Sequence, residues 1–476
     1  MATLPPARDV AALADAMFEE FGLRDDAPGL ALLVARGDDI LLEAARGLAS
    51  VDLGVPLAPS HRFPIASVGK QVVATGLLDL VAKGKVALDD PLSRFLPDFP
   101  GGADIPVVQL LDHTSGVMSY TDAPGFWTTP PPPSVTTEHL VATIAALPPA
   151  FKPGTGWAYN NSGYVLAAAV IEASSGMPWH AYLVGEVLHP HGIDGIWHPT
   201  DARAIPGLVA GHGTDEAGRV TRSVPPMFAM AHAAGGMVGD VRSLWRWNRA
   251  LHGAAILTAD LYRRMVTPEG AAAAPGPDGA PSPAYGLGIV DARMNGVATL
   301  RHSGSIHGGA TVLIWAPETA TTVVALANTD DPATMVDVVA RRLLTFATGH
   351  PYPETVAAPG ADGGLEGLSG TFARANDRIA IVVGPRGLHV SCVPSLALVL
   401  RGGRGRPGWS GQDTGAPVAV PLVHVGNDRY AVSGGLSRLA FTRDASGIAT
   451  GFRYLSDGDL GDAVPWQAVA DAATAA

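Results

Sequence analysis

Segments with strand character lie near both ends of the first 350 residues, and a long helical, loop-rich stretch separates them. Residues 29–36 and 40–46 are apolar runs on either side of a Gly-Asp-Asp turn, a pattern that predicts a β-hairpin. Strand patterns return at 285–290, 310–315 and 321–327. Because strands need neighbours to pair with, we predict one sheet assembled from both ends of a single α+β domain.

The character of the chain changes after residue 349. Residues 350–364 have the Pro, Gly and Ala content of a linker. Beyond them, short apolar segments such as 379–383 alternate with Gly, Asn and Asp turns, which is typical of a small antiparallel β-barrel. We therefore predict a first domain at 1–349 and a small barrel domain at 365–476.

Composition limits the partners and the location of this 476-residue chain. Acidic residues outnumber basic ones by 44 to 32, and the resulting net charge of −12 argues against nucleic acid as a partner. No apolar run approaches the ~18 residues that a membrane-spanning helix needs. The first twenty residues resemble an amphipathic helix rather than a signal peptide. The single cysteine, Cys392, rules out an internal disulfide, so we expect a cytoplasmic protein without a membrane partner.

A serine and a lysine lie three residues apart at the start of an expected helix. Lys70 is one of only four lysines in the chain, and it follows Ser67 in a Ser-Val-Gly-Lys sequence. Residues at this spacing share a helix face, so the lysine amine can lie beside the serine hydroxyl. A buried lysine with a lowered pKa can accept the proton that activates a serine. The residues alone leave a second interpretation open, a serine that caps a helix and a lysine on the surface.

Further motifs follow in a definite order. They are Leu-Leu-Asp-His-Thr-Ser-Gly at 110–116, Tyr-Asn-Asn at 159–161, Ala-Gly-Gly from Ala234, and Arg-His-Ser-Gly-Ser-Ile-His-Gly-Gly at 301–309. With Ser-x-x-Lys at 67–70, they resemble the serine β-lactamase and penicillin-binding protein superfamily, in its class C and D-aminopeptidase branch. The resemblance implies a β-lactamase-like antiparallel sheet flanked by helices, with a helical subdomain.

The resemblance also implies roles for matching positions. Ser67 is then the nucleophile and Lys70 its proton acceptor. Tyr159 carries a proton to the leaving group, and Asn161 holds the amide of the substrate. From the residues alone, the alternative is that Tyr159 and Asn161 are ordinary turn and helix-start residues.

The last motif departs from that of many relatives. His302 and Gly304 stand where a Lys-Thr-Gly triplet is common, and the chain has no lysine after position 152. A His-x-Gly sequence at this position resembles that of D-aminopeptidases, D-amino-acid amidases and some esterases. It argues against a dedicated β-lactamase. In this resemblance the backbone N–H groups of Ser67 and Ser305 form an oxyanion hole. For His302, a hydrogen-bonded structural histidine near the site remains an alternative.

The predicted barrel resembles the lipocalin-like domains that follow the catalytic domain in D-aminopeptidases, which usually carry two. The chain has room for one, an architecture similar to the penicillin-binding-protein-type thioesterases that cyclise non-ribosomal peptides. In that group a barrel arginine reaches the active site. Arg453 is the candidate here, and the alternative is a strand arginine that faces solvent.

We therefore expect a serine hydrolase or acyltransferase that works through an acyl-serine, without a metal or another cofactor. Its expected substrates are small peptides or amides that contain D-amino acids. The alternative is a stand-alone thioesterase that takes a peptidyl thioester from a carrier protein and cyclises it. An esterase, a β-lactamase and a non-catalytic binding module are further alternatives.

Overall fold

The structure is a computed structural model. It describes residues 4–123, 126, 135–199, 204–215, 219–223, 228–274, 284–329, 336–352, 365–374, 377–384, 387–392, 418–426, 429–432, 436–455 and 466–469.

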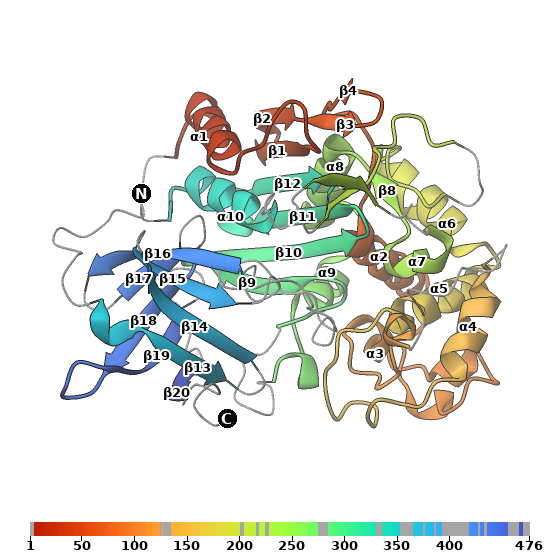
Figure 1. The fold of residues 1–476 in the computed structure, drawn as a ribbon. Coiled ribbons are helices and arrows are strands. Elements are labelled where there is room, and N and C mark those ends of the chain that lie inside the picture. The colour runs from red at the N-terminus through yellow and green to blue at the C-terminus, as the bar shows by residue number, and fades with distance from the viewer. Residues whose placement is uncertain are drawn as a thin grey trace.

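Strands from both ends of residues 1–349 form one antiparallel sheet of six strands (Figure 1). In spatial order the strands are β2 (Asp39–Arg46), β1 (Leu30–Arg36), β12 (Thr321–Ala327), β11 (Gly309–Ala316), β10 (Val297–Ile306) and β9 (Val290–Met294). The first and last parts of residues 1–349 meet where β1 pairs with β12. The predicted hairpin and the predicted sheet built from both ends are therefore confirmed.

Both faces of the sheet are covered by helices, because the central strands are apolar on both sides. Leu32 of β1 packs in a cluster with α1 (Ala7–Glu20) and α10 (Val336–Ala347). The next residue, Leu33, points to the opposite face and packs in the cluster that contains α2 (Gly69–Ala82). Figure 1 shows α1 and α10 beside the sheet, on the side away from α2.

The helical subdomain lies beyond α2. Its elements, with those that join it to the sheet, are η1 (Ala66–Val68), α3 (Val108–Leu111), α4 (Thr137–Ala145), α5 (Ser162–Ser175), α6 (Trp179–Tyr182), α7 (Phe228–Gly235), α8 (Val241–His252), α9 (Ala259–Val266) and the strand pairs β5 (Phe63–Pro64) with β8 (Val238–Gly239) and β6 (His212–Thr214) with β7 (Val220–Arg222). α2 packs against α5, and both helices are buried over most of their length. A rigid pair of core helices therefore supports the segment that carries Ser67 and Lys70.

The predicted strand at 285–290 is wrong for most of its length, because β9 begins only at Val290. The N–H of Gly286 donates to the carbonyl of Ile289 and closes a turn. Gly288 has φ +79°, and a Cβ there would lie 2.9 Å from the carbonyl oxygen of Lys70. The alternation of apolar residues and glycines therefore marks a tight turn against α2, not a strand.

The C-terminal part is a closed antiparallel barrel, as predicted. Its eight strands are β13 (Gly370–Arg374), β14 (Asp377–Gly384), β15 (Gly387–Cys392), β16 (Val418–Gly426), β17 (Arg429–Val432), β18 (Arg438–Arg443), β19 (Ala449–Leu455) and β20 (Trp466–Val469). Leu436 of the barrel packs on Val338 of α10, and Figure 1 shows the barrel on the side of the molecule away from α2. Of the predicted linker 350–364, residues 353–364 lie outside the described part of the chain.

Candidate active site

Ser67 and Lys70 contact each other at the start of α2. The Lys70 Nζ lies 3.1 Å from the Ser67 Oγ, as the three-residue spacing predicts. The Lys70 side chain is fully buried, and the Ser67 side chain does not cap α2. This geometry differs from the alternative of a capping serine with a surface lysine.

Two further oxygen atoms surround the amine. The Lys70 Nζ donates to Asn161 Oδ1 at 2.8 Å and to the carbonyl oxygen of Ala234 at 2.5 Å. A neutral amine has two N–H groups and one lone pair, and these two acceptors use both N–H groups. The lone pair is then left for the Ser67 hydroxyl. Burial lowers the pKa of Lys70 well below its ordinary value, which favours this neutral form.

Tyr159 lies beside the amine. The Lys70 Nζ is 5.0 Å from the centre of the Tyr159 ring, and the ring is half-buried. His113 packs against the other aromatic residues here, with its ring centre 4.5 Å from that of Tyr159, and its Nδ1 accepts from the backbone N–H of Asn160. Burial lowers the pKa of His113 well below its ordinary value, so it is a neutral support for the Tyr159 segment.

Asn161 joins Lys70 to the loop before α4. Its Oδ1 accepts from Lys70, and its Nδ2 donates to the Thr121 hydroxyl at 2.9 Å. The backbone N–H of Asn161 donates to Ser119 Oγ at 3.2 Å. These contacts fix the orientation of the amide in the site.

His302 is buried in β10, and both ring nitrogens have partners. The Nδ1 lies 2.7 Å from the carbonyl oxygen of Ser303, which only accepts, so Nδ1 carries the proton. The Nε2 then accepts from the hydroxyl of Tyr285 at 2.8 Å. The ring of Tyr159 lies 6.4 Å away, centre to centre. The structure thus brings His302 close to the proposed machinery and holds it through Tyr285.

Gly304 lets β10 approach the serine closely. A Cβ at this position would lie 2.8 Å from the backbone nitrogen of Ser67 and 2.8 Å from the carbonyl oxygen of Ile65. The next residue, Ser305, lines the same pocket as Ser67. Among the described residues, pairing between β9 and β10 ends at Arg301. The backbone of β10 is therefore placed to face a group bound at Ser67.

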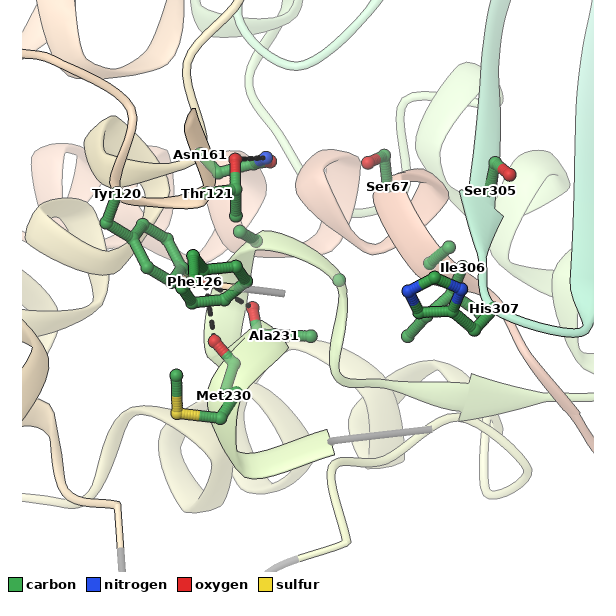
Figure 2. Close-up of a pocket in the computed structure, with 13 residues that line it drawn as sticks. Ser67, Tyr120, Thr121, Phe126, Asn161, Met230, Ala231, Ser305, Ile306 and His307 are labelled. Carbon is green, nitrogen blue, oxygen red and sulfur yellow. Dashed lines mark hydrogen bonds between the residues drawn. The ribbon is translucent and has the colours of Figure 1, made fainter. Parts of the chain in front are cut away.

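A pocket opens next to Ser67 (Figure 2). Its lining consists of Ala66, Ser67, Tyr120, Thr121, Phe126, Asn161, Met230, Ala231, Ala234, Gly235, Ser305, Ile306 and His307. Figure 2 shows Phe126 and Met230 on one side, and Ser67, Ser305 and His307 on the other. The pocket therefore offers an apolar surface at Phe126 and Met230 opposite Ser67.

Several residues in and around this pocket were not predicted from the sequence. Tyr285 and the Ala234 carbonyl were not identified as partners of His302 and Lys70. Thr121 and Phe126 have no motif of their own, and they reach the pocket only through the fold of the helical subdomain. His307 lies within the motif at 301–309, and its place in that motif was the one signal available.

Arg453 lies elsewhere among the described residues. It is exposed on β19, opposite Ala440 of β18. Every described residue that lines the pocket comes from positions 66–307, and none of these belongs to the barrel. The structure therefore does not bring Arg453 to Ser67, and its role in catalysis stays a prediction.

Within the described ranges, no cluster of three or more His, Cys, Asp or Glu side chains is arranged to hold a metal ion. In the same part of the chain, no helix has the length and apolar character needed to cross a membrane.

The six-stranded sheet with its helices and the buried serine–lysine pair define a serine hydrolase of the β-lactamase and penicillin-binding protein superfamily. The Beta-lactamase family profile matches residues 14–347, well over half of the chain. The chain belongs to this family.

Three matches show what the chain is similar to. Esterase EstB from Burkholderia gladioli is 34% identical over 208 residues, which are 39% of this chain and 51% of that protein. The structure of D-amino acid amidase from Ochrobactrum anthropi SV3 complexed with D-phenylalanine is 25% identical, with a TM-score of 0.62, and covers 71% of this chain and 99% of that chain. The structure of SurE with D-Leu is 25% identical, with a TM-score of 0.57, and covers 97% of this chain and 99% of that chain. The chain spans about half the length of the curated relatives it matches.

Proposed function

We propose that this protein hydrolyses amide or peptide bonds next to D-amino acids through an acyl-serine intermediate on Ser67. The observation that carries the proposal is the placement of the Lys70 amine, whose two N–H groups are taken by Asn161 and Ala234. The lone pair of the neutral amine then faces the hydroxyl of Ser67 at 3.1 Å. A lysine held in this way acts as the general base for its serine.

The first half-reaction makes the acyl-enzyme. Ser67 Oγ bonds to the carbonyl carbon of the substrate as Lys70 takes the hydroxyl proton. The N–H groups of Ser67 and Ser305 bind the oxyanion that forms. When the intermediate collapses, the C–N bond breaks and the leaving amine takes a proton through Tyr159. The ester on Ser67 remains.

The second half-reaction regenerates the serine. A water molecule attacks the ester carbonyl and gives up a proton to the same base. The bond to Ser67 Oγ breaks, the serine regains its proton, and the free acid leaves. Substrate, water, acid and amine balance without a further reactant.

The proposed preference for apolar D-residues draws support from two observations. Two solved relatives that match over nearly their whole length are an amidase named for D-amino acids and a protein bound to D-Leu. The pocket beside Ser67 has an apolar wall at Phe126 and Met230, which suits an apolar side chain. We therefore propose a small peptide or amide whose acyl residue is an apolar D-amino acid.

The single barrel supports a second candidate, because this architecture resembles that of the penicillin-binding-protein-type thioesterases: transfer of a peptidyl group to an amine of the same peptide. The match to SurE extends over 97% of this chain and takes in the barrel, whereas the match to the amidase covers 71%. In this reaction the attacking group is an internal amine and the product is a cyclic peptide. A peptidyl thioester on a carrier protein is then the substrate.

The test uses matched D- and L-phenylalanine amides, together with a linear peptidyl thioester mimic ending in a D-residue. The wild type is compared with Ser67→Ala and with Ser175→Ala, a control serine at the end of α5, and products are weighed by mass spectrometry. We expect the wild type and Ser175→Ala to turn over the D-amide faster than the L-amide, and Ser67→Ala to turn over neither. A product lighter than the free acid by one water identifies cyclisation, and equal rates for the D- and L-amides contradict the proposed selectivity.

A further inference from the structure

Helix α7 is broken in the middle, at a residue outside the proposed catalytic set. His232 has φ +46° and ψ −140°, a backbone conformation that residues with a side chain rarely adopt. Met230 and Ala231, just before the break, line the pocket. Ala234, just after it, supplies the carbonyl oxygen that accepts from Lys70. The break thus joins a pocket wall to the surroundings of the catalytic amine.

The ring of His232 is anchored in the helical subdomain from two sides. Its Nε2 lies 2.9 Å from the indole Nε1 of Trp179, the first residue of α6. The same nitrogen lies 3.2 Å from the hydroxyl of Thr137, the first residue of α4. An indole N–H only donates, so Nε2 is the acceptor and carries no proton. His232 therefore ties α7 to the starts of two other helices.

Burial and the two neighbouring histidines favour the neutral form of this ring. The rings of His198 and His232 lie 6.1 Å apart, and His180 stacks on His198 at 5.9 Å. Glu172 accepts from the backbone N–H of Trp179 at 3.1 Å. Burial lowers the pKa of His232 to about 3, with His198 and His180 acting in the same direction. The ring thus stays an acceptor for Trp179 at neutral pH.

We infer that His232 is a positioning residue for the proposed reaction, because its anchored ring holds the break in α7 and so places the Ala234 carbonyl on the Lys70 amine. Strained backbone at a functional site persists only when its surroundings hold it. His232 contacts Trp179 and Thr137, and it acts on the reaction only through Ala234 and Lys70. The inference rests on the proposed role of Lys70 as proton acceptor.

Loss of the ring has a specific consequence. Without its anchor α7 can move, and the Ala234 carbonyl leaves the Lys70 amine. Water then reaches the amine and the pKa of Lys70 rises toward its ordinary value, because burial is what lowers it. The neutral base becomes scarcer at a given pH. The rate of Ser67 acylation therefore falls, and the acidic limb of its pH profile moves to higher pH.

The experiment measures acylation of Ser67 by a chromogenic D-amino acid ester, with the full-length protein, from pH 5 to 9. His232→Gly tolerates the strained backbone but lacks the ring, and His232→Gln keeps an acceptor for Trp179. Trp179→Phe removes the donor and leaves His232 in place. The control is His252→Ala, which removes a half-buried histidine that stacks on Trp315 instead.

We expect the acidic limb to lie about one pH unit higher in His232→Gly and Trp179→Phe, so that acylation on this limb falls roughly tenfold at a given pH. His232→Gln should recover part of the loss, and His252→Ala should keep the wild-type profile. Wild-type rates and an unshifted limb in both His232→Gly and Trp179→Phe overturn the inference. A loss of acylation rate that is of equal size at every pH also overturns the inference, because it indicates only that fewer molecules are folded. If the wild type itself does not acylate Ser67, the proposed function fails first, and the inference with it.

Discussion

Replacing Gly304 by alanine should disable the site while leaving the fold intact. An added Cβ would lie 2.8 Å from the Ala66 Cβ, the Ile65 carbonyl oxygen and the Ser67 nitrogen. Ordinary contacts begin at 3.4 Å, so β10 and the serine segment must separate by about 0.6 Å (3.4 minus 2.8). Two of the three opposing atoms are backbone atoms, which do not give way by a change of rotamer.

This displacement acts directly on the proposed oxyanion hole. Its donors, the N–H groups of Ser67 and Ser305, lie on the two segments that are forced apart. An oxyanion donor works at about 2.7–3.1 Å from the oxyanion, so a shift of this size takes one donor out of range. Loss of one such donor costs on the order of 10² to 10³ in rate. Overpacking itself costs about 1–3 kcal/mol of stability, which a folded domain of this size tolerates.

The assay is the acylation rate with a chromogenic D-amino acid ester, measured beside thermal unfolding of each variant. Gly309→Ala is the matched control on the neighbouring strand, because a Cβ there would lie 3.5 Å from its nearest neighbour, the Ala327 carbonyl oxygen. We expect the control to keep its rate. A Gly304→Ala protein that is folded and acylates at the wild-type rate would refute the placement of the oxyanion hole.

Three further predictions concern charge. Acylation by the wild type should rise as the pH passes through the lowered pKa of Lys70, because only the neutral amine accepts a proton. Lys70→Met should abolish acylation in a stopped-flow assay. Burial lowers the pKa of His198 from 6.5 to about 4 and that of His232 from 6.5 to about 3. Between its folded pKa and 6.5, each histidine therefore binds more protons in the unfolded chain than in the folded one. The free energy of unfolding in urea should therefore fall by roughly 2–3 kcal/mol per histidine from pH 7 to pH 4.5, and an unchanged value contradicts this. Arg453→Ala should leave hydrolysis of a small ester unchanged, because its position on β19 is separate from the pocket; a loss in kcat/KM would place it in the site after all.

The parts of the fold that sequence predicted correctly are those fixed by local pattern. The hairpin at 29–46 has two apolar runs joined by a short turn, and in the barrel short apolar segments alternate with turn residues. The error at 285–290 arose where apolar residues alternate with glycines, because that pattern also suits a packed turn. Only the approach of Gly288 to the backbone of Lys70 decides between the two, and this contact is not local.

The same distinction holds for the site. Ser67 and Lys70 lie within one helical turn, so their spacing alone predicted their contact. The Ala234 carbonyl reaches Lys70 from 164 residues away, through a helix broken at His232. Tyr285 reaches His302 from within the turn that sequence interpreted as a strand. Backbone acceptors and strained conformations have no residue-type signal, which is why these partners emerged only from the structure.

The central claim is that Ser67 carries the acyl group, with Lys70 as its base. The most direct measurement is peptide mapping by mass spectrometry after a short incubation with a D-amino acid ester, stopped with acid. We expect one acyl adduct in the wild type, on the peptide that contains Ser67, and no adduct in Ser67→Ala or Lys70→Met. An adduct on another residue, or product release that continues in Ser67→Ala, would contradict it.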